Sequence, residues 1–121
     1  MQVLRKLENK PEKVFDDIPE DHKCDWYESH DKRGCFGHVA LHFYDENNCA
    51  EVHLSIHRWT LETARISRHL GMQEIVNVCK KKGVSMMVAT NENVDDQRWP
   101  KLLKMMGWPK PELVYVSVMG V

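Results

Sequence analysis

Alternation of apolar and polar residues is clearest in two segments near the middle of the chain, 37–44 and 49–57. A period of two predicts half-buried β-strands, and the Asp-Glu-Asn-Asn sequence at 45–48 is typical of a turn between them. The apolar positions share one face and are Val39, Leu41, Phe43, Val52, Leu54 and Ile56. The opposite face is polar and carries His38, His42, Glu51, His53, Ser55 and His57. The pattern therefore predicts a hairpin that gathers several histidines on one face.

A predicted helix from about Thr60 to Lys82 follows the second strand directly. Its apolar residues recur with helical spacing, Gly71 predicts a kink, and Gly83 is the expected stop. A strand that leads into a helix brings free backbone N–H groups and the positive end of the helix dipole to one point, which favours anions. Three arginines lie at this corner: Arg58, Arg65 and Arg68.

Shorter elements complete the expected order. They are a strand at 2–7, a short helix capped by Asn9 that carries Val14, Phe15 and Ile18, an irregular loop at 19–37, a strand at 84–90, a helix from Asp95 or Asp96 to Met106, and a last strand at 112–119. A strand–helix–strand unit in the middle and a returning terminal strand predict a mixed α/β sheet with helices on its faces.

Composition narrows the class of protein. The 121 residues suit one domain, and 42% hydrophobic with 29% charged residues is ordinary for a folded globule. A net charge of −1 argues against broad nucleic-acid binding. Neither a membrane-spanning run nor a signal-peptide core is recognisable, so we expect a cytoplasmic protein without membrane contact. The four cysteines form no CxxC pair, which favours reduced thiols.

Four features together resemble the Gcn5-related N-acetyltransferase (GNAT) superfamily. They are an acid in the central strand (AEVHLSI), an arginine-rich turn into a long helix (HRWTLETARISRHL), a Lys-Lys-Gly end before an apolar strand (KKKGVSMMVAT), and a late helix that ends in Gly and an aromatic residue (LLKMMGW). The resemblance implies one α/β (α+β) domain over 1–121, with a mixed, mainly antiparallel sheet. Residues 37–119 would form its core and 1–36 a reduced N-terminal region.

Two positions depart from the family pattern. The best match to its glycine-rich pyrophosphate loop is TARISR at 63–68, where Arg65 and Ser67 replace glycines. Leu103 stands where the family usually has a tyrosine that serves as general acid. In these respects the chain is similar to small, divergent GNAT-like proteins of tailed phages, some of which act in virion assembly or infection.

The resemblance implies an acyl-CoA-dependent N-acyltransferase that uses acetyl-CoA and an unidentified amine. Glu51 or His53 would be the general base. The residues expected to bind coenzyme A are Ser55, Ile56, Arg58, Arg65, Ser67 and Arg68. The alternative is a catalytically inactive phage protein of the host cytoplasm or the virion that acts through a protein partner or as a homo-oligomer.

Each candidate residue also has a plain structural interpretation. Glu62 and Arg65 could pair on a solvated helix face, and Glu51 and His53 could be ordinary strand-surface residues. The residues Trp99, Met105, Met106 and Trp108 fit core packing or a partner surface. Zinc could be held by His38, His42, His53 and His57, or by Cys24, His30, Cys35 and His38, although no common metal motif is present and we expect none.

Overall fold

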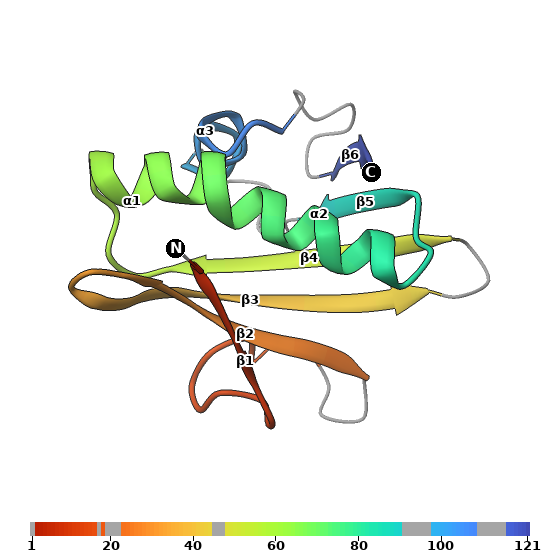
Figure 1. The fold of residues 1–121 in the computed structure, drawn as a ribbon, viewed down its shortest axis with the longest axis horizontal. Helices are drawn as coiled ribbons and strands as arrows, with labels where there is room; N and C mark the ends of the chain where they lie inside the picture. Colours follow the sequence, from red (N-terminus) through yellow and green to blue (C-terminus); the bar gives the residue numbers. More distant parts are fainter. Residues whose placement is uncertain (1, 17, 19–22, 45–47, 91–97, 109–115) are drawn as a thin grey trace.

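The computed structural model describes all residues except 1, 17, 19–22, 45–47, 91–97 and 109–115. Within this described part of the chain, six strands form one sheet in the order β1-β2-β3-β4-β5-β6. Their bounds are Leu4–Leu7 (β1), Cys24–Asp31 (β2), Gly34–Tyr44 (β3), Cys49–Ile56 (β4), Met86–Thr90 (β5) and Val116–Gly120 (β6). Neighbouring strands are antiparallel except for β4 and β5, which are parallel (Figure 1). The expected mixed, mainly antiparallel sheet is confirmed.

The connection between the two parallel strands is one long helical segment. It consists of α1 (Leu61–Ile66), a π-helical turn η2 (Ser67–Gly71) and α2 (Met72–Lys81). In the π turn the Met72 N–H donates to the Ser67 carbonyl, five residues earlier. The helix predicted for 60–82 is thus confirmed. The kink predicted at Gly71 stays a prediction, and the structure has a π turn that ends at this residue.

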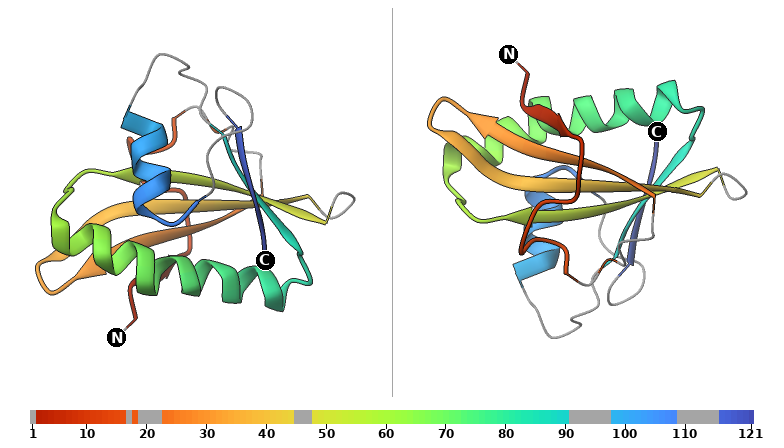
Figure 2. Two further views of the ribbon diagram at one scale, coloured as in Figure 1. Left: turned by 90° about the horizontal axis from the view of Figure 1, so that it is seen from above. Right: turned by 90° about the horizontal axis from the view of Figure 1, so that it is seen from below.

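Helices cover both faces of the sheet. Figure 2 shows α1 and α2 along one face and α3 (Arg98–Met105) on the other. The main core joins apolar side chains of the central strands and of α2, and Leu103 of α3 and Met106, the residue after α3, also belong to it. Its fully buried members include Leu41, Ile75 and Met87. None of the helices within the described residues is long and apolar enough to span a membrane.

The edge strand β1 is fastened to the helical segment as well as to its neighbouring strand. The Val3 and Leu4 N–H groups donate to the Glu74 carboxylate of α2, at 2.8 and 3.0 Å. The Val3 carbonyl accepts from the His30 N–H at 2.8 Å. Val3 and Leu4 are buried, and an edge strand leaves half of its backbone groups without a strand partner, so the Glu74 carboxylate satisfies donors that would otherwise be buried without an acceptor.

Two predictions for the N-terminal third are wrong. Residues 8–16 and Ile18 form turns and bends rather than a helix, and Lys13 and Phe15 have φ of 59° each, which a right-handed helix does not allow. Residues 24–37 of the predicted loop are not irregular, since they contain β2 and the start of β3, and residues 19–22 lie outside the described residues. The sequence conceals β2 because polar residues occur on both of its faces: Asp25 and Ser29 lie on the face that carries the core residue Tyr27, and Glu28 and His30 lie on the face that carries the buried Trp26.

The remaining elements agree with the pattern. The hairpin β3–β4 pairs Val39 with Leu54 and His42 with Glu51, so the histidine-bearing faces do combine. The strands expected at 2–7, 84–90 and 112–119 correspond to β1, β5 and β6. Asp95 and Asp96, the expected caps of the last helix, lie outside the described residues.

A close approach between β3 and β4 requires glycine at position 37. A Cβ atom at Gly37 would lie 2.8 Å from the Ser55 carbonyl oxygen and 3.2 Å from Ile56 Cα, both of them backbone atoms. Backbone cannot move aside as a side-chain tip can, so any larger residue must separate the two strands.

We therefore expect Gly37→Ala to lower the free energy of unfolding by about 1–3 kcal/mol, measured by urea titration, because the added methyl group overpacks the strand interface. Gly120→Ala is the matched control, since no heavy atom lies within 4 Å of the added Cβ there. Equal stabilities of the two variants would contradict the close-approach argument.

Candidate functional site

Within the described residues, pairing between the two parallel strands stops before the carboxyl end of β4. Their pairing ends at Val52 opposite Ala89, whereas β4 continues to Ile56. Residues 53–56 therefore have a strand partner only on the β3 side within the described chain. Every strand carries N–H and C=O groups along both edges, so this part of β4 exposes an unpaired edge toward the gap between β4 and β5.

Glu51 and His53 lie beside this point of separation. The side chains share one face of β4, and His53 Nε2 is 2.5 Å from Glu51 Oε1. The Tyr44 hydroxyl donates to the other carboxylate oxygen at 3.4 Å. Both side chains of the pair are mostly buried, with 17% of His53 and 25% of Glu51 exposed. His53 is the first residue of β4 beyond the last described β4–β5 pair, so this side chain stands at the start of the part of β4 that has no described partner on the β5 side.

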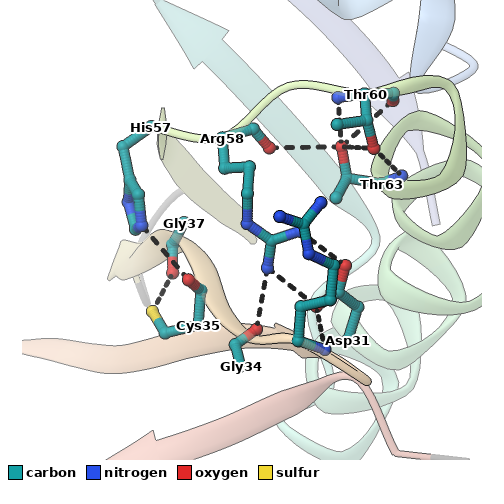
Figure 3. A network of polar contacts seen from close by, with 9 residues as sticks. Asp31, Gly34, Cys35, Gly37, His57, Arg58, Thr60 and Thr63 are labelled. Atoms are coloured by element: carbon teal, nitrogen blue, oxygen red, sulfur yellow. Dashed lines mark hydrogen bonds and ion pairs between the residues drawn. The ribbon is translucent and has the colours of Figure 1, made fainter.

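The turn between β4 and α1 is held by a buried ion pair (Figure 3). The Arg58 guanidinium donates two hydrogen bonds of 2.8 Å to the Asp31 carboxylate, and a third of 3.3 Å to the Gly34 carbonyl. The Asp31 side chain is fully buried. The hydrogen bonds from Arg58, supported by the Arg33 N–H, lower the pKa of Asp31 from 3.8 to about 2.

A capping box starts the helix immediately after this turn. The Thr60 hydroxyl accepts from the Thr63 N–H at 3.1 Å, and the Thr63 hydroxyl accepts from the Thr60 N–H at 2.8 Å. The Thr63 hydroxyl also donates to the Arg58 carbonyl at 3.2 Å. The buried Thr63 thereby couples the helix start to the ion-paired turn.

The predicted coenzyme A residues fall into two groups. Arg58 is already paired with Asp31, and Ser67 is buried at the start of the π turn. Arg65 and Arg68 are exposed, and neither forms an ion pair with another described residue, so the expected Glu62–Arg65 pair is not formed. The whole TARISR segment is helical, and its backbone N–H groups are engaged in the helix rather than free as in a glycine-rich loop.

Ser55 and Ile56 are half-buried on the unpaired part of β4. Ser55 lies opposite His38 and Ile56 opposite Gly37 across the β3–β4 ladder. Of the predicted cofactor residues, these two lie on the open edge itself.

The late-helix residues belong to the core. Leu103 is fully buried and Met106 and Trp108 are 4% exposed, so core packing rather than a partner surface describes these side chains. Met105 is 38% exposed, and the side chain of Trp99 lies outside the described residues. Leu103 can supply no proton, and its burial leaves no room for a larger phenol there.

Sequence reasoning did not identify Asp31 as the partner of Arg58. The two residues are separated by 27 positions, and the strand that ends at Asp31 was expected to be loop. The Asp-Lys-Arg-Gly sequence at 31–34, with Gly34 at a φ of 110°, was the available signal for a tight turn between two strands.

Comparison with known proteins identifies the fold. An acetyltransferase from Bacillus cereus ATCC 14579, described as an IAA acetyltransferase, superposes with a TM-score of 0.68 at 11% identity over 98% of this chain and 99% of its own. The PaiA N-acetyltransferase from Thermoplasma acidophilum, solved with coenzyme A, superposes with a TM-score of 0.58 at 15% identity. The match covers 79% of this chain and 60% of the PaiA chain.

A phosphinothricin acetyltransferase of the GNAT superfamily from Sinorhizobium meliloti, solved with acetyl-CoA, matches at a TM-score of 0.56 and 13% identity over 81% of this chain and 61% of its own. No protein-family model and no curated protein matches the chain. The chain thus has the GNAT fold. It spans nearly the whole of the first of these proteins and about three fifths of the other two.

We expect Asp31→Asn to lower the melting temperature, because it leaves the Arg58 cation with a neutral partner in a buried site. Asp25→Asn is the control: its carboxylate lies 3.9 Å from Lys6 Nζ, and the lysine is largely exposed. Since the pKa of Asp31 is lower in the folded chain than in the unfolded one, its stabilising effect is present above about pH 4 and is lost as the pH falls toward 2. Equal changes in melting temperature for both variants at pH 7 would show that the Asp31–Arg58 pair stabilises the fold no more than the exposed Lys6–Asp25 pair does.

Proposed function

We propose that this chain binds an acyl-CoA and transfers its acyl group to an amine. The observation that carries the proposal is the open edge of β4 at residues 53–56, beside the last pair with β5, in a chain with the GNAT fold. The acceptor amine and the acyl chain are not specified by this argument.

The open edge matches the chemistry of the coenzyme A arm. The pantetheine portion of coenzyme A carries two amide groups, which can pair with strand N–H and C=O groups as an added strand would. The half-buried Leu54 and Ile56, packed against the core, give this edge an apolar side for the methylene groups of the arm. A backbone N–H of β4 would face the thioester carbonyl and stabilise the negative charge that develops on its oxygen.

The phosphate end of the substrate requires cations. Arg65 and Arg68 are the exposed arginines of the helical segment that follows β4, without an ion-pair partner among the described residues. We assign these two to the phosphates of coenzyme A and give Arg58 the separate role of holding the turn. Ser67, being buried, would act through the helix rather than by direct contact.

His53 and Glu51 are suited to remove the proton from the acceptor amine. If His53 donates its Nε2 proton to the Glu51 carboxylate, Nδ1 retains a free lone pair and can act as the base, directly or through a water molecule. The amine nitrogen then forms a bond to the thioester carbonyl carbon while the carbon–sulfur bond breaks. The departing thiolate takes its proton from solvent, since Leu103 replaces the expected acid.

The second candidate is a GNAT fold without catalysis. It is favoured by the buried Leu103 and by the helical conformation of the TARISR segment, both of which remove features used by the acetyltransferase family. In that case the chain would act through a protein partner. The narrower resemblance to phage proteins of virion assembly or infection rests on the sequence features alone.

Calorimetric titration with acetyl-CoA tests the binding step. We expect micromolar affinity in the unmodified protein and a loss of more than about tenfold in Arg65→Glu, because the change replaces attraction to phosphate by repulsion. Lys80→Glu is the control: it reverses the charge of an exposed residue near the other end of the helical segment and should keep the affinity for acetyl-CoA within about twofold. Absence of binding at millimolar acetyl-CoA would reject the proposal in favour of a non-catalytic fold.

Release of free thiol from acetyl-CoA in the presence of a panel of primary amines tests the transfer step. We expect His53→Gln to reduce kcat by about 10²–10⁴-fold with little change in acetyl-CoA affinity, since the imidazole acts on the acceptor proton. The exposed His69→Gln is the control and should leave kcat unchanged. Equal turnover in both variants would remove His53 from the mechanism, whereas binding without turnover for any amine would support the non-catalytic alternative.

A further inference from the structure

A second group of reactive side chains lies at the opposite end of the histidine-bearing face from Glu51. The carboxylate of Glu28, the imidazole of His30 and the thiol of Cys35 each offer one ligand atom, and these three atoms all lie within 4.8 Å of one another. All three residues are half-buried. Such a mixture of oxygen, nitrogen and sulfur donors in a small space is unusual on a strand surface and is typical of a metal site.

A β-bulge brings the thiol into this group. The β2–β3 register pairs Glu28 with His38 and Ser29 with Gly37, and then shifts so that His30 pairs with Cys35 instead of Phe36. Strict alternation from His38 would place Phe36 on the ligand face and Cys35 on the other. Bulges are found where a strand must redirect a side chain, and this one places the Cys35 thiol beside His30.

We propose that Glu28, His30, Cys35 and His38 bind a zinc ion that links β2 to β3. His30 Nε2 is 3.2 Å from Glu28 Oε1, and His38 Nε2 is 4.0 Å from the other oxygen, Glu28 Oε2. Tetrahedral zinc with bonds of about 2.0–2.3 Å holds its ligand atoms about 3.3–3.8 Å apart. The first separation is close to that of a coordinated set and the second is slightly longer. His38 lies outside the group of three atoms within 4.8 Å of one another, so its imidazole has to rotate toward Glu28, His30 and Cys35 to complete the tetrahedron.

The ligand types favour zinc over other common metals. Calcium and magnesium prefer oxygen donors alone, whereas a thiolate with two imidazoles and one carboxylate suits zinc. The imidazole of His57 supports the site from outside, since its Nε2 lies 3.2 Å from the Cys35 carbonyl and its ring centroid lies 6.1 Å from that of His38. The nearby Asp31 carboxylate is not available, because Arg58 occupies both of its oxygens.

This set differs from both zinc sets that the sequence suggested. Cys24 pairs with His42 near the far end of β2, so it cannot join His30 and Cys35. His42 stacks on Tyr44 with ring centroids 4.4 Å apart, and His53 pairs with Glu51, so neither belongs to the group around His38. Glu28 was not among the candidates, because its segment was expected to be a loop; strand alternation brings it beside His30, and the β2–β3 register brings it beside His38.

Titration of the metal-free protein with Co²⁺ and with Zn²⁺ tests the proposal independently of any acyltransfer activity. We expect one equivalent of Co²⁺ to produce the visible bands of a tetrahedral complex and a thiolate-to-cobalt charge-transfer band, both abolished by one equivalent of Zn²⁺. Zinc should also raise the melting temperature, because it binds the folded chain in preference to the unfolded one.

The variants identify the ligands. Cys35→Ser should abolish the charge-transfer band and weaken zinc binding by more than about tenfold, whereas Cys24→Ser, half-buried on the same strand pair, should do neither. If circular dichroism shows that Cys35→Ser does not fold, the near-isosteric variants Glu28→Gln and His38→Gln take its place in the test. Each should also weaken zinc binding by more than about tenfold. Absence of stoichiometric binding in the unmodified protein, or binding lost in Cys24→Ser and kept in Cys35→Ser, would overturn the proposal.

Discussion

The buried ion pair between Asp31 and Arg58 is the constraint on which the site depends. A carboxylate removed from water must be matched by a cation with good geometry, so the turn after β2 and the turn after β4 cannot move independently. The Arg58 carbonyl then accepts from Thr63, which begins the helix. One charge pair thus links the end of β2 to the turn after β4, and the contact of Thr63 with the Arg58 carbonyl links that turn to the start of the helix.

Two irregularities of the sheet create the two candidate sites. Loss of pairing beyond Val52 leaves a length of β4 with an open edge, and the bulge opposite His30 turns a thiol toward an imidazole and a carboxylate. Regular ladders would have satisfied every backbone group and placed Cys35 on the other face. The apolar face of the same strands remains regular and packs on the long helix, so the core supplies a rigid support while the polar face supplies the chemistry.

Local patterns predicted much of this fold. The β3–β4 hairpin and the long helix have strong periodicity, because one face of each element is buried against the core, and burial imposes the pattern on the sequence. The strand β2 escaped prediction because its apolar residues Trp26 and Tyr27 lie on opposite faces among polar neighbours, so neither face shows the pattern of a half-buried strand, and backbone pairing with β1 and β3 completes it. The pairing of Asp31 with Arg58 and the gathering of Glu28 with His30 and Cys35 depend on register between strands, which no spacing along the chain reveals.

The π-helical turn at Ser67–Gly71 has a consequence for the length of the chain. A π turn contains about one residue more than an α turn, so the face that α2 presents to the sheet is rotated by about 100° from where an uninterrupted helix would place it. The helix can therefore gain or lose a residue within these five positions while both its ends stay in place. Such a turn is a natural point of insertion and deletion, and alignments of divergent relatives should be allowed a gap there rather than forced into continuous register.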